Sequence, residues 1–227
     1  MRKIPTLFER EYENHKVVGI TDKLTLPGLQ VVLDGKTIPT VKIDGSCCAV
    51  INGEWYKRYD CKKGKKAPEG AMPCQDKPDE VTGHWPHWVK LDENKPEDKW
   101  FIEAFDNYFN KYINNKELIS GDEYSPITYE AVGPHFQGNP YGLDTDTLYL
   151  HGSEIIEELQ NKPLTIDILR EYLKSHAIEG IVFWFEDPTG NYPICKIKRS
   201  DFGFEWPIKE KWYLWMLTKK YLRLIEF

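Results

Sequence analysis

Short apolar runs, separated by turn-forming residues, dominate the hydrophobic pattern of the chain. β-branched and aliphatic residues fill most of these runs, and segments of about four to eight such residues between Gly, Pro, Asn or Asp are typical of strands. The pattern predicts strands at residues 16–20, 29–33, 38–42, 127–132, 148–150, 181–185 and 194–197.

Two further runs, residues 47–51 and 54–59, flank the dipeptide Asn52-Gly53. This dipeptide tolerates positive φ at both central positions of a type I′ turn, so it predicts a two-residue β-hairpin. Pairing of Ile51 with Glu54 then places Arg58 opposite Cys47.

A helical pattern follows Pro96. Apolar residues recur at helical spacing from Phe101 to Tyr112, which predicts an amphipathic helix that ends before Gly121. Ser153 and Thr165 are expected to cap two more helices. Antiparallel strands with helices packed outside them make the expected fold class α+β.

The composition agrees with a globular protein. The 227 residues carry 30 Lys and Arg against 36 Asp and Glu, a formal net charge of −6. The length suffices for a full core without disulfides or metal. The longest apolar run, Trp212 to Leu217, has six residues against the ~20 of a membrane span, so we expect a core-packing terminal helix and no membrane partner. Charge at Glu9 and an odd number of cysteines favour the cytoplasm.

Basic residues are concentrated in two places despite the acidic total. The second group is Lys196, Lys198 and Arg199. A solvated face is the ordinary interpretation of one such run, whereas two runs beside other chemistry favour contact with nucleic-acid phosphates. The first group consists of Lys57, Arg58, Lys62, Lys63, Lys65 and Lys66.

Residues 61–94, rich in Lys, Pro and Gly, are predicted to form a long loop. Residue types that suit zinc occur there, namely Cys61, Cys74, His84 and His87. No close Cys-x-x-Cys pair is present, so loop packing or nucleic-acid contact is preferred over a structural zinc. Cys47 and Cys48 are interpreted as small buried side chains, since no His lies near them in the sequence.

The main candidate for chemistry begins with Lys42-Ile43-Asp44-Gly45-Ser46, in which a lysine leaves a strand into a glycine-containing turn. Alone, such a string is most often a strand end and a turn. Its weight comes from residues 56–59, 129–133, 179–182 and 196–198, which follow in order. A lysine nucleophile, two separated carboxylates and a lysine pair are what nucleotidyl transfer requires.

These segments resemble motifs I, Ia, III, IV and V of the covalent nucleotidyltransferases, the superfamily of polynucleotide ligases and mRNA capping enzymes. Within it the sequence is most similar to small ATP-dependent RNA ligases, over roughly residues 4–207. The segments that carry this closer similarity are 6–10, 56–60, 73–75, 82–88, 138–140 and 196–203.

The resemblance implies a role for each matching residue. Lys42 is expected to attack the α-phosphate of ATP and to carry AMP. Lys196 and Lys198 are expected to hold that phosphate and, as nearby cations, to lower the pKa of Lys42. Glu130 is expected to bond the ribose hydroxyls, and Glu179 to bind ribose or the catalytic Mg²⁺ or Mn²⁺. Both carboxylates are therefore candidate metal ligands.

Other positions are expected to contact the nucleotide or the RNA. Arg58 is assigned to the ribose or to the 5′-phosphate of the RNA, and Tyr149 to stacking on adenine. Lys57 or the Lys62 to Lys66 run would orient pyrophosphate. The remaining expected nucleotide contacts are Thr40, Val41, Asp44 and Gly45, and the expected RNA contacts are Lys57, Arg58, Lys62, Lys63, Lys65 and Lys66.

The resemblance also implies the domain organisation and the partners. Residues 1–207 are expected to form an adenylation domain on antiparallel sheets, and residues 208–227 a helical extension packed on it. The extension is too short for the oligonucleotide-binding barrel of DNA ligases and capping enzymes. The expected partners are ATP and an RNA with 5′-phosphate and 3′-hydroxyl ends, and the expected state is a monomer.

One register follows from counting. A four-residue loop from Asp187 to Gly190 pairs Glu186 with Asn191 and sets Glu179 opposite Lys198. Residues two apart on a strand share a face, so Lys196 and Lys198 are expected to lie with Glu179 on one wall of a nucleotide pocket, facing Lys42.

Two alternatives to an RNA ligase stay open. An ATP-dependent DNA ligase is one, because contacts to 2′-hydroxyl groups are not visible in a sequence. A non-catalytic protein that binds RNA ends is the other, and the presence of all the lysines and carboxylates favours an enzyme over it.

Overall fold

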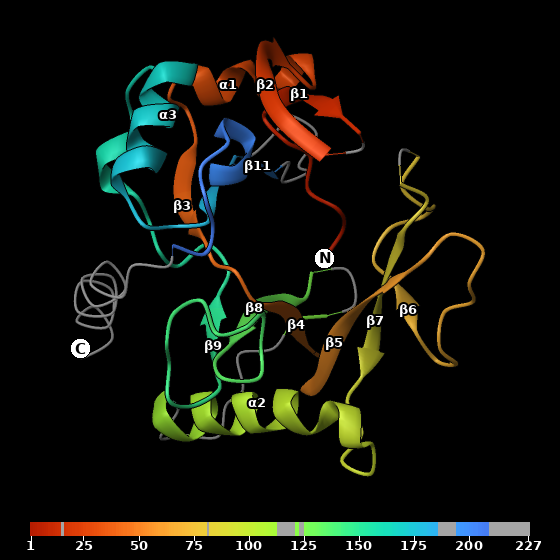
Figure 1. The fold of residues 1–227 in the computed structure, drawn as a ribbon. Coiled ribbons are helices and arrows are strands. Elements are labelled where there is room, and N and C mark those ends of the chain that lie inside the picture. The colour runs from red at the N-terminus through yellow and green to blue at the C-terminus, as the bar shows by residue number, and fades with distance from the viewer. Residues whose placement is uncertain (15, 81, 113–120, 123–124, 186–193, 209–227) are drawn as a thin grey trace. The chain divides into compact units, whose positions relative to one another are not determined.

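The computed structural model describes residues 1–227 except 15, 81, 113–120, 123–124, 186–193 and 209–227. The chain divides into two compact units (Figure 1). Unit 1 comprises Met1–Lys3 and Asp44–His151, and unit 2 comprises Ile4–Ile43 and the chain from Gly152 onward. The predicted fold class, α+β with antiparallel sheets, is confirmed.

Unit 1 is built on an antiparallel sheet of six strands in the order β6-β7-β5-β4-β8-β9. Helix α2 (Lys99–Tyr112) lies along one face of this sheet (Figure 1), where Phe105 packs with Val50, Tyr129 and Leu148. The strands are β4 (Ser46–Ile51), β5 (Glu54–Cys61), β6 (Met72–Pro73), β7 (Trp85–Lys90), β8 (Ile127–Val132) and β9 (Thr147–Leu150).

The predicted hairpin of unit 1 is confirmed with its register. Ile51 pairs with Glu54, and Asn52 and Gly53 have φ values of 51° and 77°, as a type I′ turn requires. Residues of β5 then alternate between the faces of the sheet: Trp55 stacks on Phe105 on the α2 side, and Tyr56 packs on the other side.

Unit 2 holds a three-stranded antiparallel sheet in the order β11-β10-β3 and a two-stranded ribbon of β1 and β2. Its core packs Leu169 and Leu173 of helix α3 against Ile181 and Phe183 of the sheet. Thr165 caps α3 as predicted, because its side chain accepts a hydrogen bond from the Ile168 amide. The elements are β1 (Phe8–Glu13), β2 (Lys16–Leu24), β3 (Ile38–Lys42), α3 (Ile166–Ser175), β10 (Gly180–Trp184) and β11 (Ile194–Lys198).

The predicted strand at residues 29–33 is wrong. The segment forms a 3₁₀ turn, η1 (Pro27–Leu29), followed by helix α1 (Gln30–Leu33). Pro27 occupies the first turn, where its missing N–H costs nothing. Leu29 and Val32, three residues apart, point together into the core of unit 2, so burial outweighs the strand preference of valine.

Three further segments differ from the sequence prediction. The helix expected after Ser153 is only a 3₁₀ turn, η3 (Glu157–Leu159). Strand β1 was not predicted, because its charged residues hide the alternation. The predicted 61–94 loop contains β6 and β7, where Pro86 interrupts a strand-like pattern between Trp85 and Trp88.

Some predictions lie outside the described residues. These are the pairing of Glu186 with Asn191 and, apart from Ile208, the helical extension at residues 208–227, including the Trp212 to Leu217 run. A membrane crossing needs a long apolar helix, and the described ranges contain none that meets that need.

A buried ion pair fixes the start of α2 to strand β5. Lys57 bonds Asp98, whose side chain is 1% exposed, and Asp98 also accepts a hydrogen bond of 3.0 Å from the Asp92 amide. Lys57, expected to contact RNA or pyrophosphate, thus has a partner inside unit 1. Lys62, Lys63, Lys65 and Lys66 are exposed.

We expect the substitution Lys57→Met to lower the free energy of unfolding by about 1–3 kcal/mol, because it leaves the Asp98 carboxylate buried without its cation. Urea denaturation measures the change. Lys62→Met is the matched control on an exposed lysine and should change stability by less than about 0.5 kcal/mol. Equal effects of the two substitutions would show that the ion pair adds nothing to stability.

Candidate active site

The end of the unit 2 sheet brings two of the predicted lysines into one row. Gly180 on the central strand β10 is the Cα partner of Lys42 on β3 and of Lys198 on β11. Two residues further along, Val182 has Thr40 and Lys196 as its partners. Because directly paired residues and residues two apart share a face, Lys42, Lys196 and Lys198 project from the same side of the sheet.

Gly180 lies between the two lysines of the row and must lack a side chain. A Cβ atom on Gly180 would lie 2.3 Å from the carbonyl oxygen of Ile197, a distance that no real contact allows. The missing side chain also leaves the middle of the row open. The space between Lys42 and Lys198 is therefore set by backbone packing.

The carboxylate of Glu179 joins the two lysines. Its Oε2 bonds the amine of Lys42, and its Oε1 lies 2.8 Å from Nζ of Lys198. The Glu179 side chain is only 5% exposed. A buried carboxylate is tolerated when cations and hydrogen bonds compensate the lost hydration, and here two ammonium groups do so.

The predicted register of this hairpin is wrong by one residue. Lys198 pairs with Gly180 rather than Glu179, which comes just before β10 and whose carbonyl accepts a hydrogen bond of 2.9 Å from the Arg199 amide. Glu179 precedes the first paired residue of β10. The alternation of side chains between the two faces of a strand therefore does not fix the direction of the Glu179 side chain. The expected contact between Glu179 and Lys198 is present despite the slip.

Lys196 is the lysine whose proton affinity changes most clearly. Burial, followed by repulsion from Lys42 and Lys198, lowers the pKa of Lys196 to about 8. Charge interactions are reciprocal, so Lys196 also opposes the ammonium form of Lys42, whereas the bonded carboxylate of Glu179 favours it. The predicted lowering of the Lys42 pKa stays a prediction.

An ion pair that the sequence argument missed anchors the end of β11. Asp201, 1% exposed, accepts hydrogen bonds from Nε of Arg10 at 2.8 Å and from the Lys198 amide at 2.8 Å. Arg10 and Asp201 lie in segments 6–10 and 196–203, which resemble small RNA ligases, but the resemblance assigned no role to either residue. A charged pair separated by 191 positions has no local signal.

Thr40 and Val41 have partners within the sheet region of unit 2. The Thr40 hydroxyl donates to the Val182 carbonyl at 3.2 Å and lies 2.8 Å from the indole nitrogen of Trp184, which donates to it. The Val41 amide donates to the Glu154 carbonyl at 2.8 Å. These bonds fix the strand that carries Lys42, and the expected nucleotide contacts of Thr40 and Val41 stay predictions.

Unit 1 brings together Glu130 and Tyr149 of the predicted set. On the face of the sheet opposite α2, Glu130 is the Cα partner of Cys47 on β4 and of Tyr149 on β9. His151, which the sequence argument missed, places its Nε2 2.7 Å from Oε2 of Glu130. The register of strands β8 and β9 could have indicated His151, because pairing Tyr149 with Glu130 sets His151 opposite Thr128.

The glycine of the lysine motif is required by close packing in unit 1. A Cβ on Gly45 would lie 2.3 Å from the Ala131 carbonyl oxygen and 2.8 Å from Cγ of Glu130. The neighbouring Asp44 amide donates to the Tyr141 hydroxyl at 2.6 Å. Arg58 donates to Asp60 at 2.8 Å and is 21% exposed. Arg58, Asp44 and Gly45 stay predicted nucleotide or RNA contacts.

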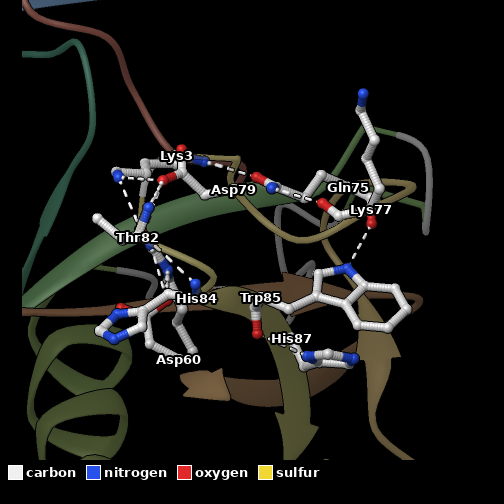
Figure 2. A network of polar contacts seen from close by, with 10 residues as sticks. Lys3, Asp60, Gln75, Lys77, Asp79, Thr82, His84, Trp85 and His87 are labelled. Carbon is white, nitrogen blue, oxygen red and sulfur yellow. Dashed lines mark hydrogen bonds and ion pairs between the residues drawn. The ribbon is translucent and has the colours of Figure 1, made fainter. Parts of the chain in front are cut away.

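Two of the zinc-type residues in the 61–94 segment, His87 and Cys61, make contacts within the protein, and the preference for loop packing or nucleic-acid contact over zinc stays a prediction. His87 Nδ1 lies 2.8 Å from the Trp85 carbonyl oxygen, and the Trp85 indole donates to the Gln75 carbonyl at 2.7 Å (Figure 2). The Cys61 thiol donates to the Lys65 carbonyl at 3.2 Å. Across the described ranges, the metal-ligating residues that gather closely enough are Cys47, Glu130 and His151.

The paired cysteines carry protons in the metal-free chain. Burial, followed by the charge of Glu130, raises the pKa of Cys47 to about 12. Burial also raises the pKa of Cys48, which is fully buried under α2. A protonated thiol is a poor nucleophile, whereas a bound soft metal ion would displace the proton.

The geometry can be compared with known proteins. No family model matches the sequence. The chain is similar to proteins named RNA ligase 1. The alignment with the one from Pongo abelii runs over 277 positions, gaps included, at 26% identity and covers 92% of this chain and 83% of that protein. The alignments with those from Rattus norvegicus and Mus musculus run over 276 positions at 25% identity and cover 92% of this chain and 83% and 82% of those proteins.

The lowered pKa of Lys196 predicts a pH-dependent stability. Between pH 8 and the ordinary lysine value of 10.5, the unfolded chain binds the proton that the folded chain has released. The penalty for folding around the charged amine is thus complete below about pH 8 and fades as the pH rises to 10.5. Relative to Lys196→Met, the wild type should therefore gain stability across this window, as urea titrations at stepped pH will measure.

Lys36→Met is the matched control for this experiment, because Lys36 is an exposed lysine of the same unit with 72% of its side chain accessible. Its stability difference from the wild type should stay flat across the window. A flat difference for Lys196→Met as well would refute the lowered pKa.

Proposed function

We propose that this protein is an ATP-dependent RNA ligase that joins a 5′-phosphate to a 3′-hydroxyl through AMP bound covalently to Lys42. The observation that carries the proposal is the cluster of Lys42, Glu179, Lys196 and Lys198, formed where the resemblance places the nucleophile and its partners. The similarity to proteins named RNA ligase 1, over nearly the whole chain, supports RNA as the substrate.

The reaction proceeds in three balanced steps. The neutral amine of Lys42 attacks the α-phosphorus of ATP, forms a P–N bond and expels pyrophosphate, and the amine proton is lost. An oxygen of the RNA 5′-phosphate then attacks the same phosphorus, the P–N bond breaks, and the Lys42 amine leaves and takes up a proton. Finally the 3′-hydroxyl attacks the 5′-phosphorus of the adenylated end, its proton is lost, and AMP departs as the phosphodiester forms.

The side chains around Lys42 influence two charges, the proton on the Lys42 amine and the negative charge on the phosphates of ATP. At neutral pH only about one free lysine in a thousand is unprotonated, so the cations beside Lys42 aid the first step by opposing its ammonium form. Lys196 and Lys198 also stand ready for the negative charge that develops on the α-phosphate and pyrophosphate. Fixed charges aimed at such a site commonly contribute a factor of about 10²–10³ each.

A divalent cation fits the donor chemistry of Glu179. Mg²⁺ prefers oxygen ligands and binds through one or two carboxylates together with substrate phosphates and water. Glu179 supplies such a carboxylate in unit 2. Glu130 stays the second candidate ligand that the resemblance implies. When bound, the cation neutralises phosphate charge, and the chain's own lysines add to that effect.

Incubation of the purified protein with ATP and Mg²⁺ should add one AMP to Lys42, which intact mass and peptide mapping will detect. Lys42→Arg should abolish the gain, because arginine stays protonated and cannot attack. Glu179→Gln and Lys198→Met should slow it by about 10²-fold or more. Lys36→Ala, an exposed lysine of the same unit, is the control and should be adenylated normally.

AMP on the Lys42→Arg variant, or a preference for GTP in the wild type, would contradict this mechanism. Ligation itself is tested on matched 5′-phosphorylated RNA and DNA, each as a nicked duplex and as a single strand. Joining of DNA alone would transfer the proposal to a DNA ligase. Adenylation without joining of any strand would refute the ligase activity.

Binding of a 5′-phosphorylated single-stranded RNA should weaken with salt, despite the net charge of −6. Each neutralised phosphate contributes a slope of roughly −0.7 in log affinity against log salt, because bound counterions are released. Replacement of Lys62, Lys63, Lys65 and Lys66 by Ala should flatten this slope and leave adenylation of Lys42 intact. Fluorescence anisotropy at several salt concentrations measures it.

A charge-matched control replaces four other exposed lysines with Ala, namely Lys23, Lys36, Lys162 and Lys174. It removes the same net charge, so it separates a local contact from a general loss of positive charge. Equal slopes for the two quadruple variants would assign the Lys62 to Lys66 run to a solvated face.

A further inference from the structure

Three side chains of different chemistry converge on the face of the unit 1 sheet opposite α2. Cys47 and Glu130 are Cα partners on β4 and β8, and His151 follows β9 directly. The sulfur of Cys47, a carboxylate oxygen of Glu130 and a ring nitrogen of His151 all lie within 4.8 Å of one another. Three neighbouring strands thus aim three ligand atoms at one point.

The donor set determines which cation fits. Mg²⁺ and Ca²⁺ prefer oxygen alone, whereas a thiolate, an imidazole and a carboxylate together suit Zn²⁺ and its neighbours in the first transition series. Around tetrahedral zinc, bond lengths of about 2.0–2.3 Å put ligand atoms roughly 3.3–3.7 Å apart. The separations in this cluster run from 2.7 Å between His151 and Glu130 up to no more than 4.8 Å, a range that includes this spacing.

The cluster also has the supporting contact typical of a metal-bound histidine. Nδ1 of His151 lies 2.9 Å from the Thr128 hydroxyl, and the His151 amide donates to the Thr128 carbonyl at 3.1 Å. These two bonds fix the ring so that Nε2 points toward Glu130. In the metal-free chain a proton lies between Nε2 and the Glu130 carboxylate, whose atoms are 2.7 Å apart. A bound cation would replace that proton, and a ring that donates from Nδ1 to Thr128 would then offer it the Nε2 lone pair, as second-shell partners orient zinc ligands.

The cluster is sheltered yet accessible. The side chains of His151 and Glu130 are 16% and 13% exposed, enough for a small cation to enter and too little for a fully hydrated exchange site. Three protein ligands leave the fourth tetrahedral position open, an arrangement found in zinc sites that bind water or a substrate atom.

We propose that Cys47, Glu130 and His151 form a binding site for Zn²⁺ or a similar thiophilic divalent cation, with Thr128 as the residue that orients His151. The site is separate in chemistry from the Mg²⁺ role assigned to Glu179. If Glu130 bonds the ribose or Mg²⁺, as the resemblance implies, the thiophilic cation competes with that ligand for one carboxylate. That consequence rests on the proposed function, whereas the metal site does not.

The test uses the reduced, metal-free full chain without ATP, titrated with Co²⁺ as a spectroscopic probe for zinc. One equivalent of Co²⁺ should give the near-ultraviolet charge-transfer band of a cobalt–thiolate bond and the visible bands of a tetrahedral site. Zn²⁺ should bleach both by displacement, and excess Mg²⁺ should not. Because no nucleotide or RNA is present, the result is independent of whether the protein is a ligase.

Variants assign the ligands. Cys47→Ser should remove the charge-transfer band, and Thr128→Val, which keeps all three ligands, should weaken Co²⁺ binding by about 10–100-fold. Cys61→Ser is the control on another thiol of unit 1, whose sulfur donates to the Lys65 carbonyl, and it should leave the spectrum unchanged. Circular dichroism verifies that each variant is folded. No thiolate band in the wild type, or a band that survives Cys47→Ser, would overturn the proposal.

Discussion

One buried carboxylate holds the candidate active site of unit 2 together. Glu179 bonds Lys42 and Lys198, which stand two strands apart and would otherwise repel each other on one face of a small sheet. Without this anion, three lysines on adjacent rows would carry uncompensated charge into a partly buried region. Strand β10 lies between β3 and β11 in the described chain. This strand order brings the lysines of β3 and β11 to the carboxylate that precedes β10.

The cluster also explains why one lysine differs from the others. Lys42 and Lys198 each have the carboxylate as a partner, whereas Lys196 experiences both of them mainly as like charges and is buried, which lowers its pKa. Burial and two like charges thus distinguish Lys196 from Lys42 and Lys198, the two lysines that bond the carboxylate. The amine that loses its proton most easily in this cluster is therefore a neighbour of the proposed nucleophile and not Lys42 itself.

Local chemistry made parts of the structure predictable. Asn52-Gly53 set the β4–β5 hairpin to the correct register, because a type I′ turn has only one length. The Lys42 motif and residues 179–182 and 196–198 indicate the cluster of lysines and carboxylate from the sequence alone. The β10–β11 register failed by one residue because it was counted from a loop of assumed length, and the loop gives no independent marker such as Asn-Gly.

Other features depend on partners far away in the chain. Leu29 and Val32 form helical turns because the core of unit 2 receives two side chains three residues apart. The pairing of Arg10 with Asp201 spans almost the whole sequence. His151 meets Glu130 only through the β8–β9 register. Sequence periodicity is a local quantity, so none of these contacts leaves a trace in it.

The two glycines beside the acidic residues limit how this sequence can drift. Gly45 packs against the backbone of Ala131 and the stem of Glu130, and Gly180 packs against the backbone of Ile197. A lineage that lost Glu179 could not regain the carboxylate by mutating the next codon, since any side chain at position 180 collides with the neighbouring strand. The carboxylate is therefore restricted to position 179. A variant that has lost it regains it most directly by restoring glutamate at that position.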